Sequence, residues 1–119
     1  DLRASIDIGS NSVLLLAADV SNNKFTELSK RSTITSLGKE LDKNKAFLKA
    51  SMDATHEAIR HYVEECDGLG IPRDKILATA TEAARVAQNS HELFDQIERD
   101  FGVKVHIITS QAEAYYSTK

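Results

Sequence analysis

Residues 7–12 combine a carboxylate with a cluster of turn-forming residues. Residues 3–8 are short and β-prone, and they stop at Gly9, Ser10, Asn11 and Ser12. A glycine at this point lets the chain turn and aim successive N–H groups at an anion, and the Asp7 carboxylate can hold a hydrated Mg²⁺ that bridges to phosphate oxygens. A hairpin turn with an incidental acid is equally common, so these residues alone leave both interpretations open.

A second candidate site occupies residues 80–85, where a strand is expected to pass into an alanine-rich helix. The N–H groups and the positive dipole at the start of such a helix favour an anion. Arg85, about one turn into the helix, can add a forked donor to a phosphate. A surface ion pair between Arg85 and a carboxylate is the alternative.

A third candidate site lies at residues 108–113, again where a strand leads into a helix. Glu113 falls in the first turn of that helix, where a carboxylate is usually only a favourable charge near the dipole. If this turn faces the same cleft as Asp7 and Arg85, Glu113 can orient and deprotonate a water molecule that attacks phosphorus.

The elements that must position these residues follow from the apolar pattern. It predicts strands over 3–8, 13–20, 24–34, 75–80 and 103–108, and helices over 48–66, 81–87, 90–101 and 111–116. Gly68, Gly70 and Pro72 are expected to end the long helix, and Asn89 to cap the helix from residue 90. The first three strands should be antiparallel, and strands separated by helices should be parallel. The sequence therefore predicts an α/β fold, a mixed five-stranded sheet with helices against it, which binds ligands at the carboxyl ends of its strands.

Composition narrows the class of protein. The 119 residues are enough for one core, and 41% apolar and 28% charged residues indicate an ordinary folded domain. The net charge of −3 offers no overall attraction to nucleic acid or to an anionic membrane, although residues 24–49 carry a net +4 that is typical of a solvated lysine-rich stretch. The longest apolar run, residues 13–18, is far below the roughly 20 residues of a membrane-spanning helix.

Cysteine and histidine give no sign of a disulfide or a zinc site. The single cysteine, Cys66, fits a reducing compartment such as the cytoplasm, and its helical position favours a small buried hydrophobe over a reactive thiol. The four histidines do not converge at metal-ligand spacing.

Three motifs together resemble a known family. Residues 6–12 read Ile-Asp-Ile-Gly-Ser-Asn-Ser, residues 80–89 read Ala-Thr-Glu-Ala-Ala-Arg-Val-Ala-Gln-Asn, and residues 108–114 read Ile-Thr-Ser-Gln-Ala-Glu-Ala. In order and spacing they resemble the amino-terminal part of the exopolyphosphatase and guanosine pentaphosphate phosphohydrolase family. The resemblance implies the actin-like, ribonuclease-H-like fold, in which two such domains flank a phosphate-binding cleft, and residues 1–119 would be one of them, a fragment of a longer protein.

The resemblance also implies roles for individual residues. Asp7 would help to place Mg²⁺, and Glu113 would be the catalytic base. The phosphate-binding residues would be Gly9, Ser10, Asn11, Ser12, Thr81, Arg85 and Asn89. The third motif departs from the family pattern, because Ser110, Ala112 and Tyr115 stand where the family usually has glycine, glutamate and arginine.

These residues predict the amino-terminal half of a Mg²⁺-dependent phosphohydrolase. Its substrate would be inorganic polyphosphate or guanosine pentaphosphate, with no nucleic acid or membrane partner, and the full-length protein would be a possible homodimer. The isolated 119-residue chain is expected to be inactive. A non-catalytic protein that binds polyphosphate or an alarmone on the same fold is the alternative, suggested by the altered third motif. A kinase or chaperone-like ATPase is a third hypothesis, which residues 80–89 disfavour.

Overall fold

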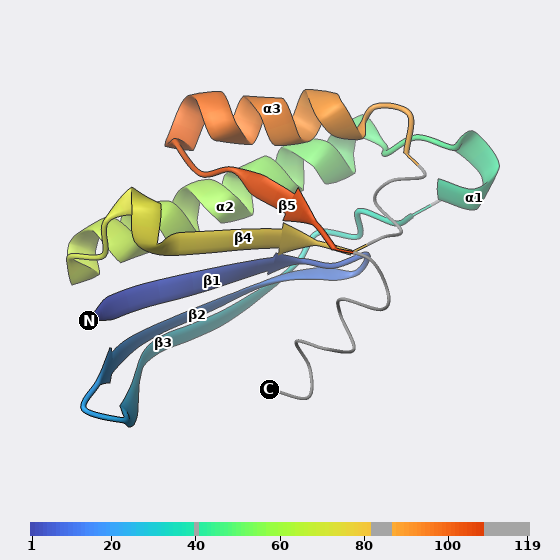
Figure 1. Ribbon diagram of the computed structural model, residues 1–119. Helices are drawn as coiled ribbons and strands as arrows, with labels where there is room; N and C mark the ends of the chain where they lie inside the picture. Colours follow the sequence, from blue (N-terminus) through green and yellow to red (C-terminus); the bar gives the residue numbers. More distant parts are fainter. Residues whose placement is uncertain (40, 82–86, 109–119) are drawn as a thin grey trace.

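A computed structural model describes residues 1–39, 41–81 and 87–108, apart from the side chains of residues 42 and 44. Its centre is a five-stranded sheet in the order β3-β2-β1-β4-β5 (Figure 1). The strands are β1 (Leu2–Ile8), β2 (Ser12–Ser21), β3 (Lys24–Ile34), β4 (Ile76–Ala80) and β5 (Val105–Ile107). The first three strands pair antiparallel, and β1, β4 and β5 pair parallel. The predicted mixed sheet is confirmed.

The hairpin between β2 and β3 forms at the predicted turn. Asn22 and Asn23 both adopt left-handed backbone angles, φ 52° and 63°. Two consecutive positive φ values match the right-handed twist of the flanking strands, and asparagine tolerates them better than most residues. The turn chemistry therefore sets the register of the two longest strands.

Helices α2 (Lys49–Leu69) and α3 (Ser90–Phe101) lie on the same side of the sheet (Figure 1). Both end at a left-handed glycine, Gly70 at φ 82° and Gly102 at φ 69°. Of the residues expected to end α2, Gly70 does so, whereas Gly68 stays inside the helix, where the cost of glycine is only about 1 kcal/mol. The helix ends where a left-handed residue is needed, at Gly70.

Other boundaries differ from the sequence prediction. A short helix, α1 (Leu41–Asn44), and a 3₁₀ turn, η1 (Arg73–Lys75), were not expected. β5 is shorter than the predicted strand over 103–108. The predicted helix over 81–87 lies outside the described residues except at its two ends, which are not helical, and the predicted helix over 111–116 lies outside them entirely.

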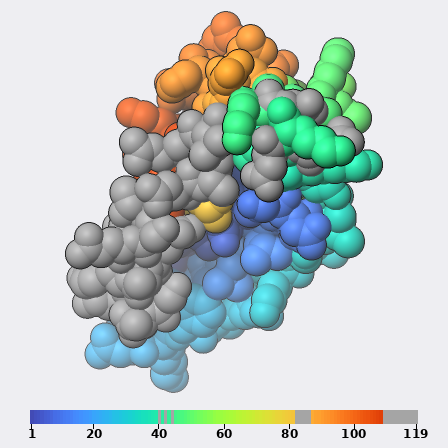
Figure 2. All heavy atoms as spheres, turned by 90° about the vertical axis from the view of Figure 1, so that its right-hand side faces the viewer, coloured from blue at the N-terminus to red at the C-terminus, as the bar shows by residue number. Residues whose placement is uncertain are grey.

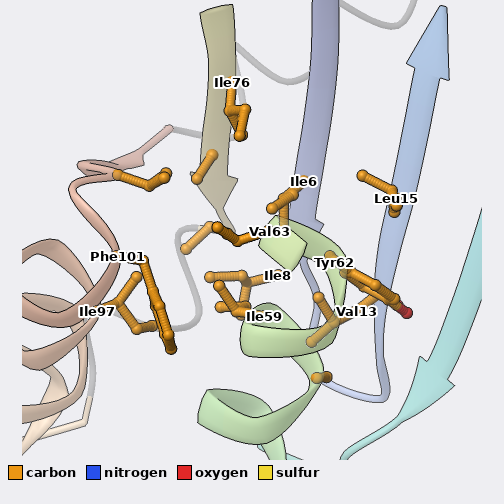
Figure 3. Packing of buried hydrophobic residues seen from close by; sticks show 14 of the residues in the cluster. Ile6, Ile8, Val13, Leu15, Ile59, Tyr62, Val63, Ile76, Ile97 and Phe101 are labelled. Carbon is orange, nitrogen blue, oxygen red and sulfur yellow. The ribbon is translucent and has the colours of Figure 1, made fainter. Parts of the chain in front are cut away.

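The core lies between the sheet and the two long helices (Figure 3). Alternate residues of β1 and β2, including Ile6 and Leu15, are buried against the face of α2 that carries Ile59 and Val63. Cys66 is fully buried in this core, and burial raises the pKa of its thiol to about 11. It behaves as the predicted small hydrophobe.

The opposite face of the sheet is open among the described residues. Leu14 is 45% exposed there and Leu77 is 53% exposed. No helix among the described residues is long and apolar enough to cross a membrane.

Candidate active site

The loop between β1 and β2 is a tight turn over residues 9–12. The N–H of Gly9 donates to the carbonyl oxygen of Ser12 over 2.9 Å. A Cβ atom at residue 9 would lie 3.1 Å from that same oxygen, so a larger residue would press on the turn. The predicted role of Gly9 as the turning point of the chain is confirmed.

Residues 35–38, which we call the strap, hold this loop from outside. The Gly38 N–H donates to the Ser10 carbonyl oxygen over 2.8 Å. The N–H groups of Thr35 and Ser36 both donate to the Asn11 carbonyl oxygen, over 3.1 and 3.0 Å. The strap can approach the loop this closely because residue 38 is glycine. A Cβ atom at residue 38 would lie 3.0 Å from the Ser10 Cβ. Sequence reasoning missed the strap, and Gly38 was its only local signal.

The strap itself is held against α2. Ser36 has a left-handed backbone, φ 52°, which is unfavourable for a residue with a side chain. Its carbonyl oxygen accepts a hydrogen bond from the Ser51 hydroxyl over 2.9 Å, and its N–H is bonded to Asn11. These bonds keep Ser36 in the conformation that brings Gly38 onto the loop.

The strap gives the loop a polarity that suits an anion. It occupies the carbonyl oxygens of Ser10 and Asn11, and Gly9 occupies that of Ser12. The N–H groups of Ser10 and Asn11 have no hydrogen-bond acceptor among the described residues. Main-chain N–H groups of an exposed loop that have no acceptor among the described residues are available to donate to phosphate oxygens.

Parallel pairing of β1 with β4 brings Thr81 to this loop. Ile8 lies opposite Ala80 in the register, so Thr81 follows β4 beside Gly9 and Ser10. These segments line one shallow indentation, whose described residues are Ile8, Gly9, Ser10, Leu37, Gly38, Leu41, Phe47 and Thr81. Figure 2 looks onto this end of the sheet, where atoms of the first loop (blue) lie beside the end of β4 (yellow) and near α1 (green). Residues from the first two motifs, which are far apart in the sequence, therefore meet here.

Asp7 lies two residues before Gly9, and its side chain is on the open face of the sheet. It is paired with Leu14 on one side and Thr79 on the other. The side chain is exposed, yet the neighbouring strands remove enough water to raise the pKa of its carboxyl above the ordinary value. A carboxylate near the end of a strand, two residues before a loop, fits a hard cation that keeps most of its water, as Mg²⁺ does. Among the described residues no three potential metal ligands converge, so an all-protein metal cage is not present there.

Three predicted site residues remain. Arg85 and Glu113 are outside the described residues. Asn89 precedes α3 as expected, but its side chain makes no capping hydrogen bond. Instead the Asn89 amide binds the main chain of Phe47, which local sequence pattern does not reveal.

Comparison with known proteins gives a consistent result. Residues 16–119 match the model of the Ppx/GppA phosphatase family. A bifunctional 3-dehydroquinate synthase/phosphatase of Fusobacterium nucleatum is 32% identical over 99% of this chain, which corresponds to 18% of its own length. A guanosine-5'-triphosphate,3'-diphosphate pyrophosphatase of Aeromonas hydrophila is 28% identical over 95% of this chain and 22% of its own length.

A solved structure extends the likeness to the fold. The crystal structure of the Aquifex aeolicus member of the Ppx/GppA family superposes with a TM-score of 0.91 at 32% identity, over 97% of this chain and 37% of that chain. The present chain thus spans well under half the length of these relatives. The chain belongs to the Ppx/GppA phosphatase family and has the actin-like, ribonuclease-H-like fold of that family.

Proposed function

We propose that this chain is the amino-terminal part of a Mg²⁺-dependent phosphohydrolase that removes the terminal phosphate of inorganic polyphosphate or guanosine pentaphosphate. One observation carries the proposal: the strap binds the carbonyl oxygens of Ser10 and Asn11, while the N–H groups of these two residues have no acceptor among the described residues, in a loop that lies beside Thr81. The A. hydrophila relative, named for a guanosine pentaphosphate substrate, supports this choice of substrate class.

In the proposed reaction the loop binds the phosphoryl group that is transferred. The N–H groups of Ser10 and Asn11, with the hydroxyl groups of Ser12 and Thr81, donate to its oxygens, and the Arg85 guanidinium offsets the charge that accumulates there. Asp7 would hold Mg²⁺, which supplies positive charge to the phosphate oxygens when bound.

Glu113 is the proposed base. Its carboxylate accepts a proton from a water molecule, and the water oxygen forms a bond to the terminal phosphorus. The bond between that phosphorus and its bridging oxygen breaks, and the bridging oxygen keeps the electron pair on the shortened chain. The products are inorganic phosphate and a substrate one phosphate shorter.

The decisive experiment measures phosphate release by the intact protein from polyphosphate and from guanosine pentaphosphate, with Mg²⁺. Glu113→Gln should lower kcat by about 10²- to 10⁴-fold, the range for loss of a general base. Glu92→Gln, in the first turn of α3 and exposed, is the matched control and should retain full turnover. Turnover by Glu113→Gln equal to that of the parent would remove Glu113 from the mechanism.

A non-catalytic binding protein is the second candidate. The observation that favours it is the altered third motif, where Ser110, Ala112 and Tyr115 replace a glycine, a carboxylate and a cation of the usual family pattern. Saturable binding of polyphosphate by the intact protein, with no phosphate release, would establish this second function and overturn the first.

A further inference from the structure

Residues 88–89 and residues 45–47 are joined by main-chain and side-chain hydrogen bonds, which we call the bracket. Asn89 Oδ1 accepts from the Phe47 N–H over 2.8 Å, and Asn89 Nδ2 donates to the Phe47 carbonyl oxygen over 3.0 Å. The Gln88 N–H donates to the Lys45 carbonyl oxygen over 2.8 Å. One carboxamide thus satisfies both main-chain groups of Phe47.

The bracket uses the donor capacity of Asn89. A primary amide has two N–H donors. One is bonded to Phe47, and Nδ2 also lies 3.3 Å from Met52 Sδ, within the range of a hydrogen bond to sulfur. With both donors engaged inside the protein, Asn89 has none left for a phosphate oxygen.

Phe47 connects the bracket to the candidate active site. Its side chain is only 5% exposed and lines the same indentation as Gly9, Ser10, Gly38 and Thr81. Lys45, two residues before it, is held in a left-handed conformation, φ 56°, by its N–H bond to the Leu41 carbonyl oxygen and by Gln88. The segment that carries Phe47 has no regular secondary structure, so the bracket supplies its fixed geometry.

We propose that Asn89 is a positioning residue: it fixes Phe47 as the floor beneath the 9–12 loop and does not bind phosphate itself. This inference rests on the proposed function, because it assigns Asn89 a part in the same site. Its physical basis is preorganisation. If the floor is loose, only a fraction of molecules present a competent loop, and apparent affinity falls by that fraction.

A double-mutant cycle in the intact protein tests the route through Phe47. Asn89→Ala alone should raise KM for polyphosphate about tenfold with kcat within about twofold, as expected for loss of preorganisation. In a Phe47→Ala background, Asn89→Ala should change KM less than about twofold, because its effect passes through the missing ring. A full tenfold effect in that background would show direct contact with substrate and overturn the proposal.

A second readout is independent of catalysis. Hydrogen exchange at the Phe47 amide should accelerate about tenfold in Asn89→Ala, while amides in β1 and β2 keep their rates. Gln96→Ala, at an exposed amide residue of α3 that lines a separate surface groove together with Phe47 and Asn89, is the matched control and should change neither exchange nor KM. Unchanged exchange at Phe47 in Asn89→Ala would also overturn the proposal.

These readouts separate failure of the bracket from failure of the proposed function. If the intact parent releases no phosphate, the proposed hydrolase is wrong, and affinity for tripolyphosphate replaces KM in the same cycle. If Phe47→Ala does not fold, Phe47→Leu keeps an apolar floor, and the cycle should then show partial coupling. Fully additive effects of Asn89→Ala and Phe47→Leu would count against the bracket.

Discussion

Two glycines give the candidate site its shape, and they do so by absence of a side chain. Gly9 and Gly38 both place main chain where a Cβ atom would meet a neighbour at 3.0 to 3.1 Å. Neither has the positive φ that usually explains a glycine, since positive φ is found at Gly70 and Gly102. Glycine is needed at these two positions because the main chain lies close to neighbouring atoms, so a larger residue at either one should disturb the loop.

Alanine substitutions at Gly38 and Gly68 distinguish a steric requirement for glycine from its general effect on backbone flexibility. Gly38→Ala should lower the free energy of unfolding by about 1 to 3 kcal/mol, because the strap must move away from Ser10. Gly68→Ala, with no atom within 4 Å of the new Cβ in a helix, should raise it by about 0.5 to 1 kcal/mol. Denaturant unfolding of the two variants checks this. Equal effects in the two variants would mean that the strap does not press on the loop.

The ionised Asp7 carboxylate is expected to lower the stability of the folded protein while it provides a ligand for Mg²⁺. Because the folded-state pKa of its carboxyl is raised above the ordinary value of 3.8, the ionised form opposes folding. That penalty is fully present above the raised pKa and disappears as the pH falls toward 3.8. Asp7→Asn should therefore be more stable than the parent at pH 7 without Mg²⁺, and the difference should shrink in acid.

The same variant should bind Mg²⁺ more weakly. Asp7→Asn is expected to need about tenfold more Mg²⁺ for half-maximal phosphate release, because the carboxylate ligand is gone. Unfolding curves at pH 7 and pH 4, together with a Mg²⁺ titration of phosphate release, provide both measurements. A variant less stable at pH 7, or one with an unchanged Mg²⁺ requirement, would contradict the role given to Asp7.

At the scale of elements, a buried hydroxyl adds hydrogen bonds to the apolar packing of α2 on the sheet. The Tyr62 hydroxyl donates to the Val13 carbonyl oxygen over 2.9 Å and lies 2.6 Å from the Thr33 hydroxyl. It thus joins α2 to both β2 and β3, just beyond the 9–12 loop. Since Ser51 of the same helix holds the strap, the position of α2 controls both sides of the loop.

Tyr62→Phe should cost about 1 to 2 kcal/mol of unfolding free energy, because it leaves the buried Val13 carbonyl oxygen and the half-buried Thr33 hydroxyl without this partner. The comparison is Lys49→Ala, which removes an exposed 3.3 Å ion pair with Asp53 on the same helix and should cost less than about 0.5 kcal/mol. Thermal or denaturant unfolding compares the two. A loss in Tyr62→Phe no larger than in Lys49→Ala would show that the hydroxyl does not anchor the helix.

Local pattern predicted the elements better than the contacts between them. The strands and both long helices follow from alternation and from helical spacing, and the turn at Gly9 from its residue types. The strap could not be predicted, because its partners lie about 25 residues away and are main-chain carbonyl oxygens, which carry no residue signature. The same holds for Asn89, whose cap-like position gives no sign of its bond to Phe47.

At the scale of the whole molecule, one face of the sheet is covered and the other is open among the described residues. A sheet with parallel strands is usually covered on both faces. The chain spans 18% to 37% of the relatives described above, so related proteins contain much more structure than the part seen here. We propose that the rest of the full-length protein completes the cleft over the 9–12 loop.

The isolated 119-residue chain should therefore release phosphate at least about a hundredfold more slowly than the intact protein, because groups that position the substrate are missing. Circular dichroism must first show that the isolated chain is folded. Removal of Mg²⁺ with a chelator should abolish release by the intact protein, and added Mg²⁺ should restore it. Equal rates for the isolated chain and the intact protein would contradict the two-part site.

The most direct test of the central claim follows the amide signals of Ser10 and Asn11 in the intact protein, labelled with ¹⁵N at serine and asparagine, during titration with tripolyphosphate. We expect saturable shifts of these two amides at the same midpoint, and a weaker midpoint in Gly38→Ala. Shifts confined to other serine and asparagine residues, with Ser10 and Asn11 unmoved at saturation, would contradict phosphate binding by this loop.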